Sequence, residues 1–162
     1  MPTWPRVSIR AIGLLAAAMS VAGLLYDAPA AHAGDDVARA RRAAWAAYRG
    51  DARSQTVLGF MYETGRGVPQ HFGNSVEWYS RAADQGDPTA QYLLGLMYDK
   101  GHGVPQDWVL AHKWLILATA NAPRQQRDYY ARIRDAVAFK LTPAQIDEAQ
   151  DLANAWRPVR ER

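Results

Sequence analysis

The sequence contains one stretch twice, as LGFMYETGRGVPQ at residues 58–70 and as LGLMYDKGHGVPQ at residues 94–106. The two copies are 36 residues apart, and the same register extends beyond the motif to Trp78 and Trp114. A repeat of this length is typical of stacked supersecondary units, each of which completes its core only against its neighbours. We therefore expect a linear array that contains two full units.

Each unit has the pattern of two helices joined by a turn. Apolar residues of the first helix in the second unit recur at helical spacing, at Ala90, Leu94, Met97 and Tyr98. Asp87 can cap this helix, and Pro88 suits its first position because the missing N–H costs nothing there. Gly101 permits a positive φ and Pro105 cannot continue a helix, so the pattern predicts a turn between antiparallel helices.

Glycine also occurs in the middle of the first helix of each unit, at Gly59 and Gly95. Glycine in a helix interior costs about 1 kcal/mol relative to alanine. We therefore expect the second helix of each pair to cross these positions too closely for a side chain.

The N-terminal segment has the order of a secretory signal peptide. Basic residues precede a short apolar run, and Ala31-His32-Ala33 provides the small residues that signal peptidase requires. The alternative is a retained anchor, but the run is shorter than the roughly 20 residues that span a bilayer and contains glycines. We expect cleavage after Ala33, no membrane insertion afterwards, and a periplasmic or secreted protein.

The expected organisation is a signal peptide, two repeats and helical caps at both ends. Thr142-Pro143-Ala144-Gln145 has the form of a capping box that begins the last helix. Two full units are fewer than the three or so that usually give a stable array, so self-association is a further expectation. The segments are 1–33 (signal peptide), 34–49 (capping helix), 50–85 and 86–121 (repeats), and 122–162 (C-terminal capping helix pair).

Composition argues against several functional classes. The chain has no cysteine, which excludes disulfides and a lipoprotein anchor, and its formal net charge is +3 without a dense basic stripe, so no nucleic-acid partner is expected. His71, His102 and His112 lack metal-ligand spacing, and no nucleophile or phosphate-binding motif occurs. We expect no catalytic residues, no metal and no cofactor.

The repeated residues resemble the Sel-one-like repeat, a relative of the tetratricopeptide repeat, over Gly50 to about Asn121. The first unit departs from the pattern where Ser54 and Ser75 replace alanines. The resemblance implies an all-α fold, a right-handed solenoid of antiparallel helix pairs. The second unit carries the pattern at Ala90, Leu94, Gly95, Tyr98, Gly101, Gly103, Val104, Ala111, Trp114 and Ala118.

The resemblance also implies a function. Proteins of this type are mostly adaptors that hold partner proteins or peptides in a concave groove, so we expect a non-enzymatic, periplasmic or secreted interaction module. The alternative is a cell-wall-associated protein that binds peptidoglycan or a β-lactam, with weak hydrolase activity. Exported relatives linked to penicillin-like compounds are rich in cysteine, and this chain has none.

One face of the first helix carries different residues in the two units, whereas the repeated core positions stay the same. Inner helices line the concave surface of helical arrays, so this face is the predicted partner groove, the alternative being an ordinary solvated face. Phe60 and Tyr92 are the expected anchors, and Glu63 and Asp99 are expected to favour a basic partner. The predicted binding residues are Arg53, Thr56, Phe60, Glu63, Thr89, Tyr92, Leu96 and Asp99.

Overall fold

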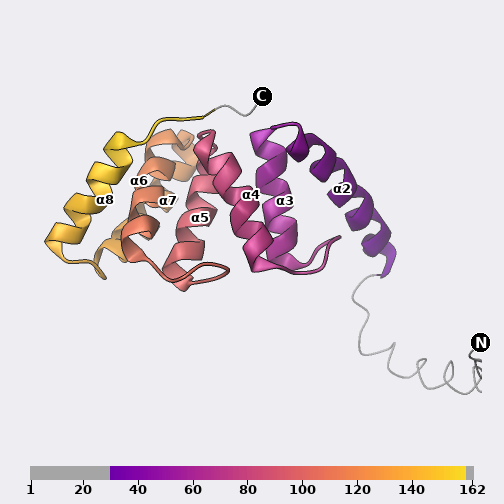
Figure 1. Cartoon of the computed structure of the whole chain (residues 1–162), viewed down its shortest axis with the longest axis horizontal. Coiled ribbons are helices and arrows are strands. Elements are labelled where there is room, and N and C mark those ends of the chain that lie inside the picture. The colour runs from indigo at the N-terminus through magenta and orange to yellow at the C-terminus, as the bar shows by residue number, and fades with distance from the viewer. Residues whose placement is uncertain (1–29, 160–162) are drawn as a thin grey trace, which may run out of the picture.

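The structure is a computed structural model that describes residues 30–159. The expected signal peptide, residues 1–33, lies outside this range except for its last four residues, which begin the first helix. None of the helices within 30–159 has the length and apolar character needed to cross a membrane. The described chain consists of helices without strands: α2 (Ala30–Tyr48), α3 (Ala52–Thr64), α4 (Phe72–Asp84), α5 (Pro88–Lys100), α6 (Trp108–Asn121), α7 (Arg124–Ala138) and α8 (Pro143–Ala155) (Figure 1).

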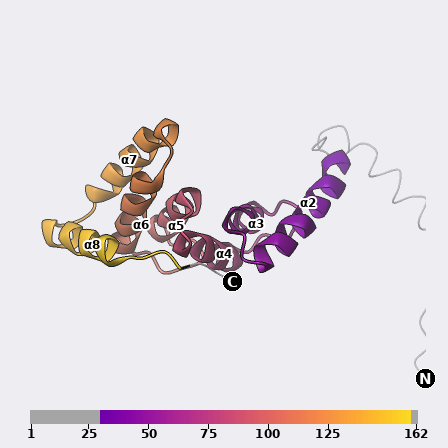
Figure 2. The same ribbon diagram turned by 90° about the horizontal axis from the view of Figure 1, so that it is seen from above.

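The all-α solenoid expected from the sequence is confirmed. The helix pairs α3–α4 and α5–α6 form the two repeats, and α4 packs on α5 to join them. The helices stand side by side along the molecule (Figure 1). Viewed from above, the array is curved: α3 and α5 form the floor of the concave side, α2 and α7 rise at its two ends, and α4 and α8 lie on the outer side (Figure 2).

Local sequence signals place the helix ends. The carboxylates of Asp51 and Asp87 cap α3 and α5 by accepting hydrogen bonds from the N–H groups three residues later, each at 2.7 Å. The side-chain and backbone hydrogen bonds from Ser54 hold the pKa of Asp51 below its ordinary value. α5 ends at Gly101, whose φ of 70° lies in the left-handed region. The chain then turns into α6.

The two helices of each repeat cross closely at a glycine, as predicted. A Cβ atom on Gly59 would lie 2.6 Å from Cδ1 of Tyr79. A Cβ on Gly95 would lie 2.9 Å from Cγ of Leu115 and 3.2 Å from the carbonyl oxygen of Ala111. Both distances to side-chain carbon are shorter than ordinary van der Waals contact, so these crossings exclude any side chain.

The C-terminal end differs from the two repeats in its packing. α7 and α8 both pack against α6, and they diverge from each other instead of forming a close hairpin (Figure 2). The chain after α8 turns back along the array, where Trp156 packs against the central core. The N–H of Val159 donates a hydrogen bond of 2.8 Å to the carbonyl oxygen of Asp84 at the end of α4. The C-terminal segment thus ties the end of the array to its first repeat.

Replacing Gly95 with leucine is expected to lower the free energy of unfolding by about 1–3 kcal/mol, because the new side chain must displace Leu115 and backbone of α6. The control is Ala120→Leu, which adds the same side chain at an exposed position of α6 and should change stability by under about 0.5 kcal/mol. Thermal and urea denaturation followed by circular dichroism measure both. Equal stability of the two variants would contradict the close crossing.

Candidate functional site

The concave side contains two neighbouring hollows that meet on α3. The first has a volume of about 310 Å³ and extends from α3 to the start of α7; the second, of about 90 Å³, lies between α3 and α2. Val57 lines both hollows, so we call them together the α3 groove. The α3 groove is lined by Asp36, Arg39, Arg53, Thr56, Val57, Phe60, Met61, Arg66, Asp87, Pro88, Thr89, Pro123 and Gln126.

Four of the eight predicted binding residues lie in this groove: Arg53, Thr56, Phe60 and Thr89. Phe60 is 43% exposed and Val57 is 39% exposed, which leaves apolar surface open to a ligand. Thr56 contributes less to that surface because it is buried. Its hydroxyl shares one hydrogen between the carbonyl oxygen of Ala52 at 3.0 Å and the carboxylate of Asp87 at 3.1 Å, and the second contact joins the two repeats.

Tyr92, the second predicted anchor, is covered by α7. Its ring stacks on Tyr130 with ring centroids 4.4 Å apart and planes 8° apart, and its hydroxyl lies 3.1 Å from that of Tyr129. Burial, followed by the hydrogen bond to Tyr129, raises the pKa of Tyr92. Tyr92 therefore holds α7 in place and is not an open anchor. Leu96, also on α5, is half-buried and does not line the groove.

The two predicted acidic residues have partners within the molecule. A carboxylate oxygen of Glu63 accepts a hydrogen bond of 2.7 Å from the hydroxyl of Tyr79, whose pKa is raised by burial and by this bond. Asp99 forms an ion pair with Lys140 at 2.6 Å. Neither carboxylate lines the α3 groove.

Arginine sets the charge of the groove instead. Arg39, Arg53 and Arg66 line it beside the carboxylates of Asp36 and Asp87. The side chains of Arg39 and Arg66 are 62% and 60% exposed. Nη1 of Arg39 and Nε of Arg66 each lie 3.8 Å from a carboxylate oxygen of Asp36, and exposed ion pairs at this distance are weak. The lining therefore has one more basic than acidic side chain, and the acidic residues from which we expected a preference for a basic partner lie outside it.

The groove also contains residues that the sequence did not single out. Val57 directly precedes the repeated motif, and its exposure depends on how α2 and α3 diverge. Arg39 comes from an arginine-rich helix whose composition was visible, but its position beside Phe60 depends on the stacking. Pro123 and Gln126 lie at the start of α7, where the repeat pattern breaks down.

His71, His102 and His112 each contact other parts of the fold. Nδ1 of His71 caps α4 by accepting the N–H of Asn74 at 3.0 Å, and the ring of His102 packs on Phe72 with centroids 5.0 Å apart. His112 is buried in α6, and this burial lowers its pKa. Within residues 30–159 no group of three or more His, Asp or Glu side chains is placed to hold a metal ion.

Alanine substitutions should separate the two predicted anchors. Tyr92→Ala is expected to lower the free energy of unfolding by about 2 kcal/mol, because it removes the contacts with α7. Phe60→Ala should cost under about 1 kcal/mol, since its ring is largely open. Tyr92→Phe, which keeps the stacking, is the control and should stay near wild type. Urea denaturation measures all three, and equal losses for Phe60→Ala and Tyr92→Ala would show that α7 does not depend on Tyr92.

Comparison with known proteins supports the architecture. A family model described as the Sel1 repeat matches residues 52–87 and 88–122. A solved protective antigen present in uropathogenic Escherichia coli strains, which displays an SLR fold, is 30% identical with a TM-score of 0.68 over 72% of this chain. A Sel1 repeat protein from Oxalobacter formigenes is 42% identical with a TM-score of 0.52 over 57% of this chain.

The chain spans 24% of the length of the first of these proteins and 69% of the length of the second. A search of curated proteins gave no match. The two matched segments coincide with the helix pairs α3–α4 and α5–α6 that form the two repeats. The chain belongs to the Sel1 repeat family.

Proposed function

We propose that this chain is an exported, non-enzymatic adaptor whose α3 groove binds an acidic, extended segment of a partner protein. Sel1 repeat proteins are typically scaffolds for protein–protein interaction. The observation that carries the finer proposal is the pair of neighbouring hollows that share Val57, lined by the open apolar side chains of Val57 and Phe60 and by arginines. Localised apolar anchors with a charged surround are the usual form of a peptide-binding surface.

Arginine is suited to this role because its planar guanidinium binds carboxylates with two parallel hydrogen bonds. Arg39 and Arg53 lie in the two different hollows, on either side of Val57. A segment that contacts both would place its acidic side chains at the ends and an apolar side chain between them. Phe60 and Val57 would cover that apolar side chain.

The length of α3 indicates how long an extended segment that follows this helix would be. α3 has 13 residues, and a helix of this length is about 20 Å long at 1.5 Å per residue. An extended chain advances about 3.3 Å per residue, so about six residues cover that distance. The partner would bind through a short linear segment.

Peptide binding tests the groove. A fluorescent hexapeptide of alternating Glu and Leu should bind at low salt, and its Lys-for-Glu counterpart should bind at least about tenfold more weakly. The double variant Arg39→Glu with Arg53→Glu should bind the acidic peptide about tenfold or more weakly, as measured by fluorescence anisotropy. The control for Arg39→Glu is Arg41→Glu, the same substitution on α2 but outside the groove, which should leave affinity unchanged.

Equal binding of the two peptides, or no effect of the groove substitutions, would contradict the proposal. Sedimentation with purified peptidoglycan is the parallel measurement for the cell-wall alternative. If the protein sediments with peptidoglycan, and the groove variants do so equally well, the result would favour the cell-wall alternative.

Export has its own test. The mature protein isolated after expression is expected to begin at Gly34, as measured by intact mass and N-terminal sequencing. Ala33→Tyr should block cleavage because signal peptidase requires a small residue there, whereas Val37→Tyr, four residues later, should be processed normally. An unprocessed wild-type chain would argue against the signal peptide.

A further inference from the structure

The two ends of the array carry helix faces of opposite charge. α2 packs against α3 through Ala40, Ala43 and Ala47, which are buried. The opposite side of α2 is exposed and carries Val37, Arg41 and Trp45, which follow one another at four-residue spacing along one side of the helix. Arg42 and Arg49 are exposed on the same outer side, and we call these five residues the α2 outer face.

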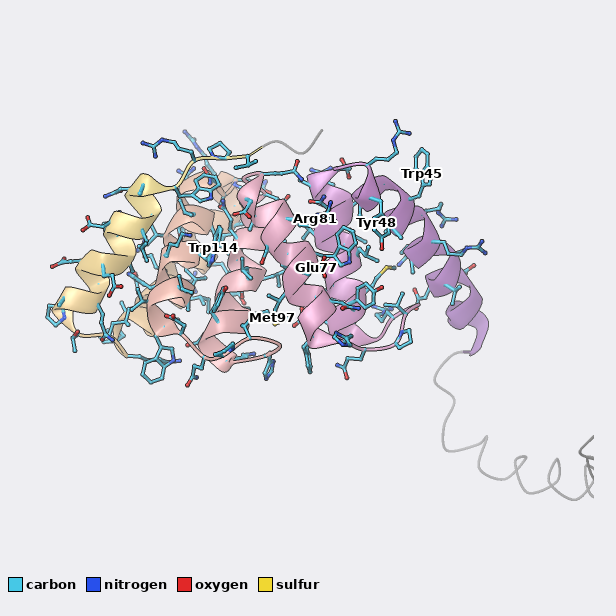
Figure 3. The ribbon with its side chains drawn as sticks, viewed as in Figure 1. Trp45, Tyr48, Glu77, Arg81, Met97 and Trp114 are labelled. Atoms are coloured by element: carbon cyan, nitrogen blue, oxygen red, sulfur yellow. The ribbon has the colours of Figure 1, made fainter. Side chains whose placement is uncertain are left out.

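Aromatic surface is prominent on the α2 outer face. Trp45 is 66% exposed, and it projects from α2 away from α3 (Figure 3). The guanidinium of Arg49 lies 4.6 Å from the centre of its ring. Within residues 30–159, neither Arg41 nor Arg42 forms an ion pair. A large exposed aromatic ring on a helix face that also carries arginines has the composition of an interface centre, where Trp and Arg are enriched.

The outer face of α8 has the complementary charge. Ala149 and Ala153 face inward and are buried, and the exposed side carries Asp147, Glu148 and Asp151. α8 contains no lysine or arginine, and none of the three carboxylates forms an ion pair within the described chain. We call these three residues the α8 outer face.

The helices that carry these faces, α2 and α8, lie at opposite ends of the array (Figure 1). In a helical array each unit buries its surface against the next, and the end units lack a neighbour on one side. A second copy placed head to tail would bring three arginines on the α2 outer face against three carboxylates on the α8 outer face. The same-charge arrangements, α2 on α2 or α8 on α8, would bring like charges together.

We propose that this protein associates with itself head to tail, with the α2 outer face of one copy docked on the α8 outer face of the next. The contact is heterologous, so each added copy leaves one free face of each kind and association continues beyond the dimer. The inference is independent of the peptide-binding proposal, because neither Arg39 nor Phe60 belongs to either outer face. None of the residues that line the α3 groove belongs to either outer face.

Sedimentation velocity of the protein purified after export tests the proposal. The weight-average mass should rise with protein concentration at low salt and fall as ionic strength increases. Arg41→Glu with Arg42→Glu, or separately Asp147→Lys with Asp151→Lys, should raise the dissociation constant at least about tenfold. Trp45→Ser, which removes exposed surface without changing charge, should also weaken association.

Mixing the two charge variants is the decisive step. Neither should associate alone, because each carries the same charge at both ends, but an equimolar mixture should associate because opposite charges then meet at each contact. Arg39→Glu with Arg53→Glu, the groove variant, is the control and should associate as wild type does. Circular dichroism confirms that each variant is folded.

Two results would overturn the proposal. One is a wild-type protein that remains monomeric at all concentrations measured, and the other is a mixture of folded charge variants that stays monomeric. Self-association that is lost in the α2 variant but retained in the α8 variant would also overturn it, since that result indicates a symmetric contact through α2.

Discussion

The structure depends on a buried glutamine that joins each repeat to the helix before it. Gln55 and Gln91 occupy the same position in the two repeats, and both side chains are fully buried. Their Nε2 groups donate hydrogen bonds of 3.1 Å to the carbonyls of Ala47 and Ala83, which lie in the last turns of the preceding helices. Each carbonyl also accepts the backbone N–H of a glycine just after its helix, Gly50 at 3.0 Å and Gly86 at 2.9 Å, so the glutamine is a second donor to it. The glutamine thus fixes the distance between the first helix of each repeat and the helix that precedes it.

The 36-residue register continues beyond the second repeat with different residues. Arg127 lies 36 residues after Gln91, and its guanidinium donates a hydrogen bond of 3.1 Å to the carbonyl of Ala122. Tyr130 lies at the corresponding distance from Leu94 and is also buried. α7 is therefore placed as the first helix of a third unit, although its sequence no longer follows the motif. Its position at the end of the concave floor is held by the stacking of Tyr130 on Tyr92.

Local signals explain what the sequence predicted and what it did not. The helix pairs, the aspartate caps and the glycine crossings each depend on residues within one unit, so spacing and side-chain chemistry were sufficient to predict them. The partners of Tyr92 and Asp99 lie 37 to 41 residues later, in and after α7. These contacts form only after stacking, and Ala122-Pro123 breaks the motif just before them. Tyr130 lies 36 residues after Leu94, and this spacing is a sequence signal that could have predicted α7 as a further helix of the array.

This difference explains why the candidate site is narrower than the repeated pattern implied. Positions that vary between repeats serve two purposes, which the sequence does not separate. On α5 they hold α7, because Tyr92 packs on its tyrosines, and Asp99 pairs with Lys140 just after it. On α3 the neighbouring helix is α2, which contacts α3 through small alanines and leaves Phe60 open. In a short array, some of the residues that vary between repeats contact the end helices and are not available to a partner. The variable residues that remain form the surface open to a partner.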